Sequence, residues 1–121
     1  MRQIKVYRKE YERLPVRFQK KLESDLNYLI KAEIPGMKKI YLFGSCSRGE
    51  VRSSSDIDLL IVTKTQLMDR SLMADIRWTL DEDLDGVKTD VVFTCEEGCM
   101  SSQVFQREVE KDKKLILEVR E

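Results

Sequence analysis

The sequence predicts an α/β fold of the α+β type, in which a small mixed three-stranded sheet is flanked by about four helices. Short apolar runs typical of strands alternate with segments of helical periodicity, and turn residues separate them. No linker, repeat or low-complexity stretch interrupts this order. Because 121 residues suffice for one hydrophobic core, we expect residues 1–121 to form a single domain.

The first half of the chain predicts one helix and two strands, whereas the first dozen residues match no pattern. Apolar side chains recur at helical spacing at Leu14, Phe18, Leu22, Leu26, Leu29 and Ile30. Pro15 suits the first turn of this helix, and Pro35-Gly36 ends it. Lys39–Phe43 alternates as a short strand, and Ile57–Thr63 is an apolar run typical of a buried strand.

The second half predicts a helix, a strand and a final helix. The first of these spans Met68–Leu84, and Asp85-Gly86 ends it. Its inner face is expected to hold Leu72, Met73, Ile76, Leu80 and Leu84. A third strand covers Val87–Thr94. The final helix begins near Ser101 and runs through a charged segment into the apolar residues 115–117. Its inward side chains are expected to be Val104, Phe105 and Val109.

Composition excludes several classes of protein. The longest apolar stretch, Leu59–Val62, is too short to cross a bilayer, and the N-terminus lacks a signal-peptide run, so we expect a cytoplasmic protein. No histidine is available for a zinc or Cys-His site. Residues 1–40 hold eleven basic and five acidic side chains, and residues 69–97 hold three and nine. Since no aromatic residues alternate with the basic ones, this charge pattern favours solvated surface over nucleic-acid binding.

The most specific pattern is Gly44-Ser45, which ten residues separate from Asp56-Ile57-Asp58. Gly44 ends one predicted strand and Asp56 begins the next, so a shared site requires these strands to be antiparallel. Asp90 stands near the start of the third strand, which the intervening helix makes parallel to the second. The sheet is therefore predicted to be mixed.

The carboxylates suit a divalent cation. Asp56 and Asp58 point to one face of their strand while Ile57 points to the core. Mg²⁺ combines one or two carboxylates with water and substrate phosphates, and Asp90 could help to hold a second ion. The alternative interpretation is a polar strand entrance or a helix cap for the pair, and an ordinary strand start for Asp90.

The Gly44-Ser45 pair suits a phosphate. Gly44 lacks a Cβ and lets the backbone approach a ligand closely, and Ser45 offers its hydroxyl and amide. Residues 47–50 predict a short helix whose N-terminus faces the same anion. Arg48 either contacts phosphate or pairs with an acid, and Ser55 is a candidate to support the carboxylates. The alternative is a strand-to-helix turn without a ligand.

Two segments together resemble the signature of the DNA polymerase beta-type nucleotidyltransferase superfamily, and the short chain most resembles its minimal nucleotidyltransferase group. They are Gly44-Ser45-Cys46-Ser47-Arg48-Gly49 and Ser55-Asp56-Ile57-Asp58-Leu59-Leu60-Ile61. The resemblance implies a nucleotidyltransferase fold. It further implies that Asp56, Asp58 and Asp90 bind Mg²⁺ and are catalytic, and that Gly44 and Ser45 hold the triphosphate. Cys46-Ser47 departs from the small, Ala-like residues frequent in the family, which leaves the chemistry undisturbed.

The resemblance also implies a biological role. Stand-alone members, the MntA-like antitoxins of type VII toxin-antitoxin systems, are encoded beside an all-helical ribonuclease toxin of the HEPN family. They transfer AMP from ATP to a tyrosine of that toxin and silence it. Two alternatives remain: an enzyme that modifies a small hydroxyl compound such as an aminoglycoside, and a non-catalytic module that binds its partner.

Overall fold

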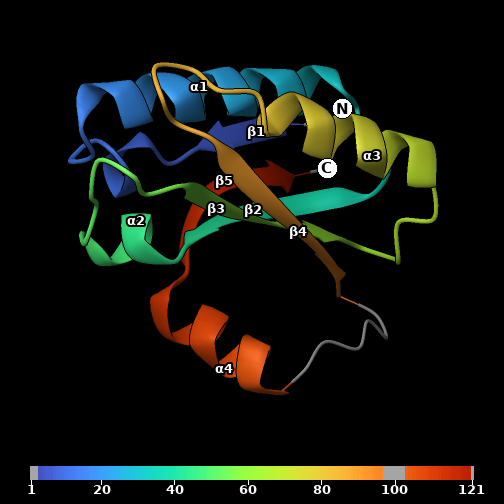
Figure 1. Ribbon diagram of the computed structural model, residues 1–121. Coiled ribbons are helices and arrows are strands. Elements are labelled where there is room, and N and C mark those ends of the chain that lie inside the picture. Colours follow the sequence, from blue (N-terminus) through green and yellow to red (C-terminus); the bar gives the residue numbers. More distant parts are fainter. Residues whose placement is uncertain (1–2, 97–102, 121) are drawn as a thin grey trace.

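The computed structural model describes residues 3–96 and 103–120. The elements in chain order are β1 (Gln3–Val6), the 3₁₀ helix η1 (Arg8–Glu10), α1 (Val16–Lys31), β2 (Met37–Phe43), α2 (Ser45–Arg48), β3 (Ile57–Thr63), α3 (Arg70–Leu80), β4 (Thr89–Cys95), α4 (Gln103–Asp112) and β5 (Lys114–Arg120). One five-stranded sheet, in the order β1-β5-β2-β3-β4, forms the middle layer. Helices α1 and α3 cover one face of the sheet and α4 lies on the other (Figure 1). None of the described helices is long and apolar enough to cross a membrane.

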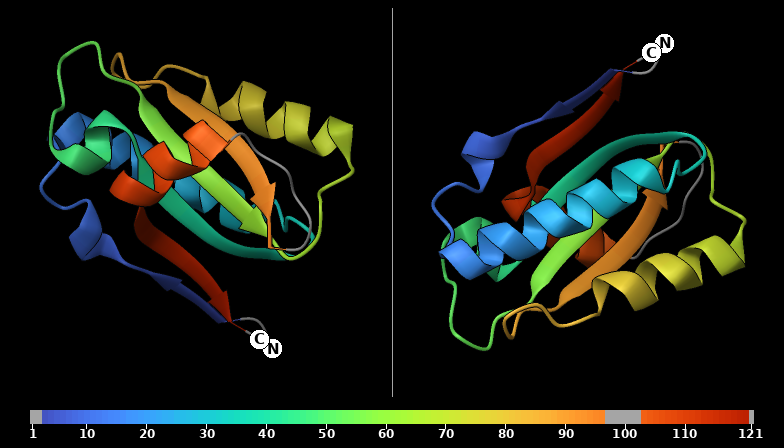
Figure 2. Two further views of the ribbon diagram at one scale, coloured as in Figure 1. Left: turned by 90° about the horizontal axis from the view of Figure 1, so that it is seen from below. Right: turned by 90° about the horizontal axis from the view of Figure 1, so that it is seen from above.

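The predicted mixed sheet is confirmed. Strand β2 pairs with β3 antiparallel, and β4 pairs with β3 in parallel after the crossover through α3. The four predicted helices correspond to α1, α2, α3 and α4 in the described part of the chain. The views from below and from above show α4 on one side of the sheet and α1 with α3 on the other (Figure 2).

The predicted number of strands was wrong, because the sheet gains β1 and β5. The apolar residues 115–117 belong to β5 and not to the last helix, which ends at Asp112. A short apolar run does not distinguish strand from helix by periodicity, and here pairing with β1 and β2 decides it. Strand β1 comes from the unassigned first dozen residues. All four of its residues are exposed, so it lacks the alternation of buried and exposed side chains that identifies a strand.

Helix α3 is shorter than predicted at both ends. The Asp69 side chain caps it by accepting a hydrogen bond from the Leu72 amide at 3.0 Å. At the other end, Leu84 and Val87 exchange two backbone hydrogen bonds across Asp85-Gly86, whose φ values are positive. This tight turn is incompatible with helix, so Leu84 is 39% exposed, whereas Ile76 and Leu80 are buried as predicted.

The last helix can be compared with its prediction only in part. The predicted start at Ser101 lies outside the described residues, as do the side chains of Val104 and Phe105. Val109 is buried, as predicted.

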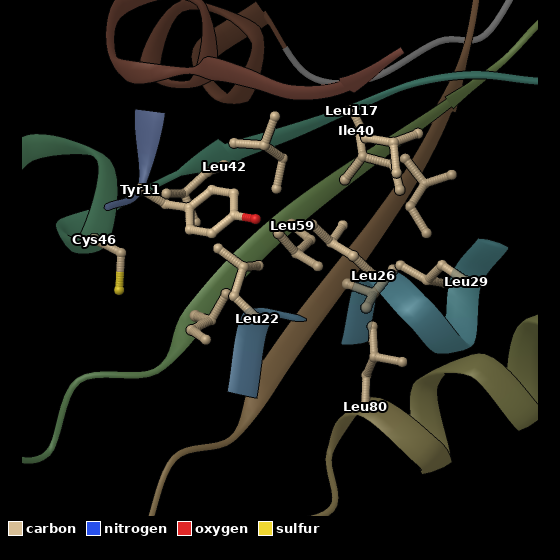
Figure 3. Close-up of a cluster of buried hydrophobic side chains, with 14 of the residues drawn as sticks. Tyr11, Leu22, Leu26, Leu29, Ile40, Leu42, Cys46, Leu59, Leu80 and Leu117 are labelled. Atoms are coloured by element: carbon tan, nitrogen blue, oxygen red, sulfur yellow. The ribbon is translucent and has the colours of Figure 1, made fainter. Parts of the chain in front are cut away.

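The hydrophobic core fills the space between the sheet and α1 (Figure 3). Leu22, Leu26 and Leu29 project from α1 toward Ile40 and Leu59 of the central strands. Each of these side chains is buried, which stabilises the fold by roughly 1.5 to 3 kcal/mol per residue. Because side chains alternate along a strand, the residue between the buried Ile57 and Leu59 faces the opposite side of the sheet.

Candidate active site

A glycine turn joins β2 to α2 and lies against a carboxylate. Gly44 has φ 75° and ψ −155°, a conformation open almost only to glycine. A Cβ at this position would collide with the carboxylate of Asp58. The Gly44 carbonyl accepts hydrogen bonds from the amides of Ser47 and Arg48, at 3.1 and 3.2 Å. The backbone at the end of β2 is thus held in direct contact with the start of β3.

Strand register brings two of the predicted acids side by side. Asp58 is the register partner of Asp90 across the parallel β3–β4 pair and of Phe43 across the antiparallel β2–β3 pair. Residues in register on neighbouring strands project from the same face of the sheet. Asp56 precedes β3 by one residue and is exposed, as is Asp90, whereas Asp58 is half-buried.

The three carboxylates repel one another in this arrangement. Burial and, after it, the nearby negative charges of Asp90 and Asp56 raise the pKa of Asp58 to about 6, although Arg48 lowers it. Burial, helped by the charge of Asp58, also raises the pKa of the Cys46 thiol to about 11. The ionised Asp58 carboxylate, half-buried and close to two further negative charges, is suited to a cation.

The acids do not form a closed metal cage. Among residues 3–96 and 103–120, no three His, Cys, Asp or Glu side chains converge as metal ligands. Mg²⁺ needs no such cage, because it takes one or two carboxylates and completes its octahedral shell with water and phosphate oxygens. The all-oxygen chemistry of Asp56, Asp58 and Asp90, together with their mutual repulsion, fits this mode of binding.

Arg48 pairs with acids in this structure. Its Nη1 donates a hydrogen bond to Asp112 at the end of α4, at 2.9 Å, and its Nε donates to Glu50 at 3.2 Å. Both contacts raise the pKa of the guanidinium. Arg48 is nevertheless near enough to lower the pKa of Asp58, so it lies beside the acids.

The two predicted serines occupy different places. Ser45 is the first residue of α2, directly after Gly44. Ser55 stabilises the turn before β3: its Oγ accepts a hydrogen bond from the Arg52 amide at 2.8 Å, and its own amide donates to the Arg52 carbonyl at 3.0 Å. These contacts tie Ser55 to the loop, and they place its hydroxyl at Arg52.

Sequence reasoning missed a buried polar network on the opposite face of the sheet. Lys21 of α1 donates hydrogen bonds to Asp25 at 2.5 Å and to the Leu80 carbonyl at 2.8 Å, and Thr89 donates to the other oxygen of Asp25. Burial raises the pKa of Asp25 although both donors lower it. The network joins α1 to the end of α3 and to the residue before Asp90. In the sequence, this network is indicated only by a lysine and an aspartate four residues apart beside the apolar stripe of α1.

Solved structures with the same fold include toxin-antitoxin assemblies. The chain is 28% identical to a chain in the crystal structure of a toxin-antitoxin with AMP-PNP, covering 77% of this chain and 70% of that chain, with a TM-score of 0.56. It is also 28% identical to a chain in a mutant of the toxin-antitoxin MntA-HpeT, covering 78% and 70%, with a TM-score of 0.55.

A third structure shares the fold at lower identity. It is a candidate nucleotidyltransferase from Sulfolobus solfataricus, 24% identical, covering 83% of this chain and 79% of that chain, with a TM-score of 0.56. The curated proteins contain no significant match to this chain.

One family matches most of the chain. Residues 24–121 match the family described as "Polymerase beta, Nucleotidyltransferase". The match includes the Gly44 turn and all three acids, and it excludes only β1, η1 and the start of α1. The chain therefore belongs to the polymerase beta nucleotidyltransferase family and is a nucleotidyltransferase.

Proposed function

We propose that this chain is a type VII antitoxin that transfers AMP from ATP to a tyrosine hydroxyl of a HEPN-family ribonuclease toxin and thereby inactivates it. The observation that carries the proposal is the position of Asp58, which lies in register with Asp90 and in contact with the Gly44 turn. Two neighbours at 28% identity are toxin-antitoxin structures, and one of them contains the ATP analogue AMP-PNP. These similarities support both the nucleotide and the class of partner.

The acids are the proposed metal ligands. Asp56, Asp58 and Asp90 would hold one or two Mg²⁺ ions together with the phosphates of ATP, and this arrangement would relieve the repulsion among the carboxylates. Bound Mg²⁺ supplies neutralisation of the phosphate charge and activation of the attacking oxygen.

The glycine turn is the proposed triphosphate site. The Gly44 backbone can approach the phosphates closely, and Ser45 offers its hydroxyl and amide. We include Arg48 and Ser55 in the nucleotide-binding set. To bind phosphate, Arg48 would exchange its ion pair with Asp112 for a phosphate oxygen.

The reaction is an in-line displacement at the α-phosphorus. The tyrosine oxygen forms the new bond to that phosphorus, the bond to the α–β bridging oxygen breaks, and pyrophosphate leaves. Asp90 receives the phenolic proton, since the chain contains no histidine to do so. The chain contributes by positioning the reactants and by compensating charge. We assign the reaction to the cytoplasm, where ATP and the RNA substrates of a ribonuclease toxin occur.

A labelling experiment tests the proposal. The purified protein is incubated with ATP labelled at the α-phosphate, Mg²⁺ and extract of its source cells, beside the Asp56→Asn, Asp58→Asn double variant, whose folding is checked by circular dichroism. A labelled protein band that is lost with the variant is the expected result. Label only in small molecules would favour an aminoglycoside-type enzyme, and absence of label would favour a non-catalytic binding module.

A further inference from the structure

A shallow hollow lies between α3 and β4, the outermost strand of the sheet in the described residues. One stripe of α3 and its C-cap residue borders it, with helical spacing i, i+3, i+4 and i+7: Ala74, Arg77, Trp78 and the C-cap Asp81. The other side is β4, which pairs only with β3 in the described sheet. The hollow measures about 440 Å³, and the candidate catalytic residue Asp90 is among its lining residues.

The most exposed large apolar side chain of the described residues borders this hollow. Trp78 is 85% exposed, while Ile76 and Leu80 on the inner side of the same helix are fully buried. The indole therefore contributes nothing to the core, and tryptophan is the residue type most enriched among the anchors of protein interfaces. Arg77 is held beside it, with its guanidinium 5.1 Å from the centre of the Phe93 ring.

The order of the strands places the hollow on the acceptor side of the reaction. Gly44 at the end of β2 lies on one side of Asp58, and Asp90 on β4 lies on the other. In an in-line displacement, the attacking oxygen and the leaving pyrophosphate stand on opposite sides of the phosphorus. If the triphosphate occupies the Gly44 turn, the acceptor approaches from the β4 side. Although α3 covers the face of the sheet opposite the carboxylates, the hollow adjoins β4 and is lined by Asp90.

The charge around the hollow suggests the chemistry of the partner. The lining of the hollow holds two acids, Asp81 and Asp90, and one base, Arg77. The wider segment 70–90 carries six acidic and three basic side chains, all of which are exposed. The three bases are Arg70, Arg77 and Lys88, and the guanidinium of Arg77 lies over the Phe93 ring. A partner with a positively charged surface would be attracted and oriented by this field.

We propose that the α3 stripe and the β4 edge form the docking surface for the acceptor protein, which presents a basic surface around its reactive tyrosine. Trp78 is the anchor, and docking there brings the tyrosine hydroxyl to Asp90. This inference rests on the proposed function, because it assumes that the acceptor is a protein.

The test compares Trp78→Ala with a matched control, Met68→Ala, which truncates another apolar side chain that is 76% exposed and does not line the hollow. Both variants are assayed with the purified HEPN toxin of the source cells, labelled ATP and Mg²⁺. The KM for toxin and the KM for ATP are measured separately. Because Trp78 lies on the surface, the variant is expected to fold normally.

Trp78→Ala is expected to raise the KM for toxin by roughly tenfold to thirtyfold, with the KM for ATP unchanged, since interface anchors contribute effects of this size. Met68→Ala is expected to match the wild type. Asp81→Lys is expected to raise the KM for toxin and to weaken its dependence on salt. An unchanged KM for toxin in Trp78→Ala would overturn the docking surface while leaving the proposed function intact. A wild-type protein that transfers no AMP to the toxin would overturn both.

Discussion

Replacing Asp58 with asparagine is expected to stabilise the metal-free protein while it abolishes AMP transfer. The asparagine side chain has nearly the same shape as aspartate, so it fits against the Gly44 backbone. It carries no charge to be repelled by Asp90 and Asp56. The substitution therefore separates the contribution of the carboxylate to stability from its contribution to function.

The size of the effect follows from the pKa of Asp58. The value rises from 3.8 to about 6 on folding, chiefly through burial and then through Asp90. At about 1.4 kcal/mol per pKa unit, ionisation in the folded state costs about 3 kcal/mol above pH 7. Because Asp58 is only partly buried, solvent screening reduces this figure to about 1 to 2 kcal/mol.

The direction of the Asp58 pKa shift determines how stability depends on pH. The folded state holds the Asp58 proton more tightly than the unfolded chain does, so this group lowers stability as the pH rises from about 4 to about 6. Asparagine does not titrate. The stability advantage of Asp58→Asn is therefore expected to be near zero below pH 4 and to reach its full value above pH 6.

Urea denaturation in EDTA at several pH values measures this difference. Asp75→Asn, which neutralises an exposed aspartate of α3, serves as the control and is expected to change stability by less than about 0.5 kcal/mol. If Asp58→Asn unfolds more easily than the wild type at pH 7, Asp58 is a structural residue and the reasoning is refuted.

Three further predictions concern the turn, the buried network and the metal. Gly44→Ala is expected to destabilise the protein by about 2 to 3 kcal/mol, because the positive φ strains an alanine and its Cβ would clash with Asp58. Gly49 has the same φ but open space around it, so Gly49→Ala is expected to cost about 1 kcal/mol. Urea denaturation compares the two variants. Lys21→Ala is expected to cost about 3 to 5 kcal/mol, because the buried Asp25 loses its ion-pair partner and keeps only the hydrogen bond from Thr89. Equal stability by calorimetry would contradict this. EDTA is expected to abolish AMP transfer and added Mg²⁺ to restore it, and ATP with Mg²⁺ is expected to raise the Tm by several degrees.

The half of the fold that contains the site could be predicted from local patterns. The apolar runs at β2 and β3 and the periodic segment at α3 each identify an element, and the positions of Gly44, Asp56 and Asp90 constrain how the strands run. The pairing of Asp58 with Asp90 follows from that topology, because consecutive elements form this part of the sheet.

The other half depends on pairing over long sequence separations. Strand β1 contains only four residues, all of them exposed, and it is held by pairing with β5, more than a hundred residues later. The apolar run in β5 is equally compatible with the end of a helix until the strands that pair with it are known. Because neither strand supplies a candidate site residue, the error in strand number left the predicted site unchanged.

The partner of the Arg48 side chain could not be inferred from the local sequence. From the sequence, a phosphate contact and an ion pair were equally good interpretations of its side chain. The structure shows the ion pair, and the acid involved is Asp112, 64 residues away, at the end of α4 on the face of the sheet opposite α1 and α3. No pattern near Arg48 encodes that contact. If Arg48 binds phosphate, ATP must compete with Asp112 for the guanidinium. Asp112→Asn is then expected to lower the KM for ATP. An unchanged KM for ATP would mean that Arg48 only joins α2 to α4.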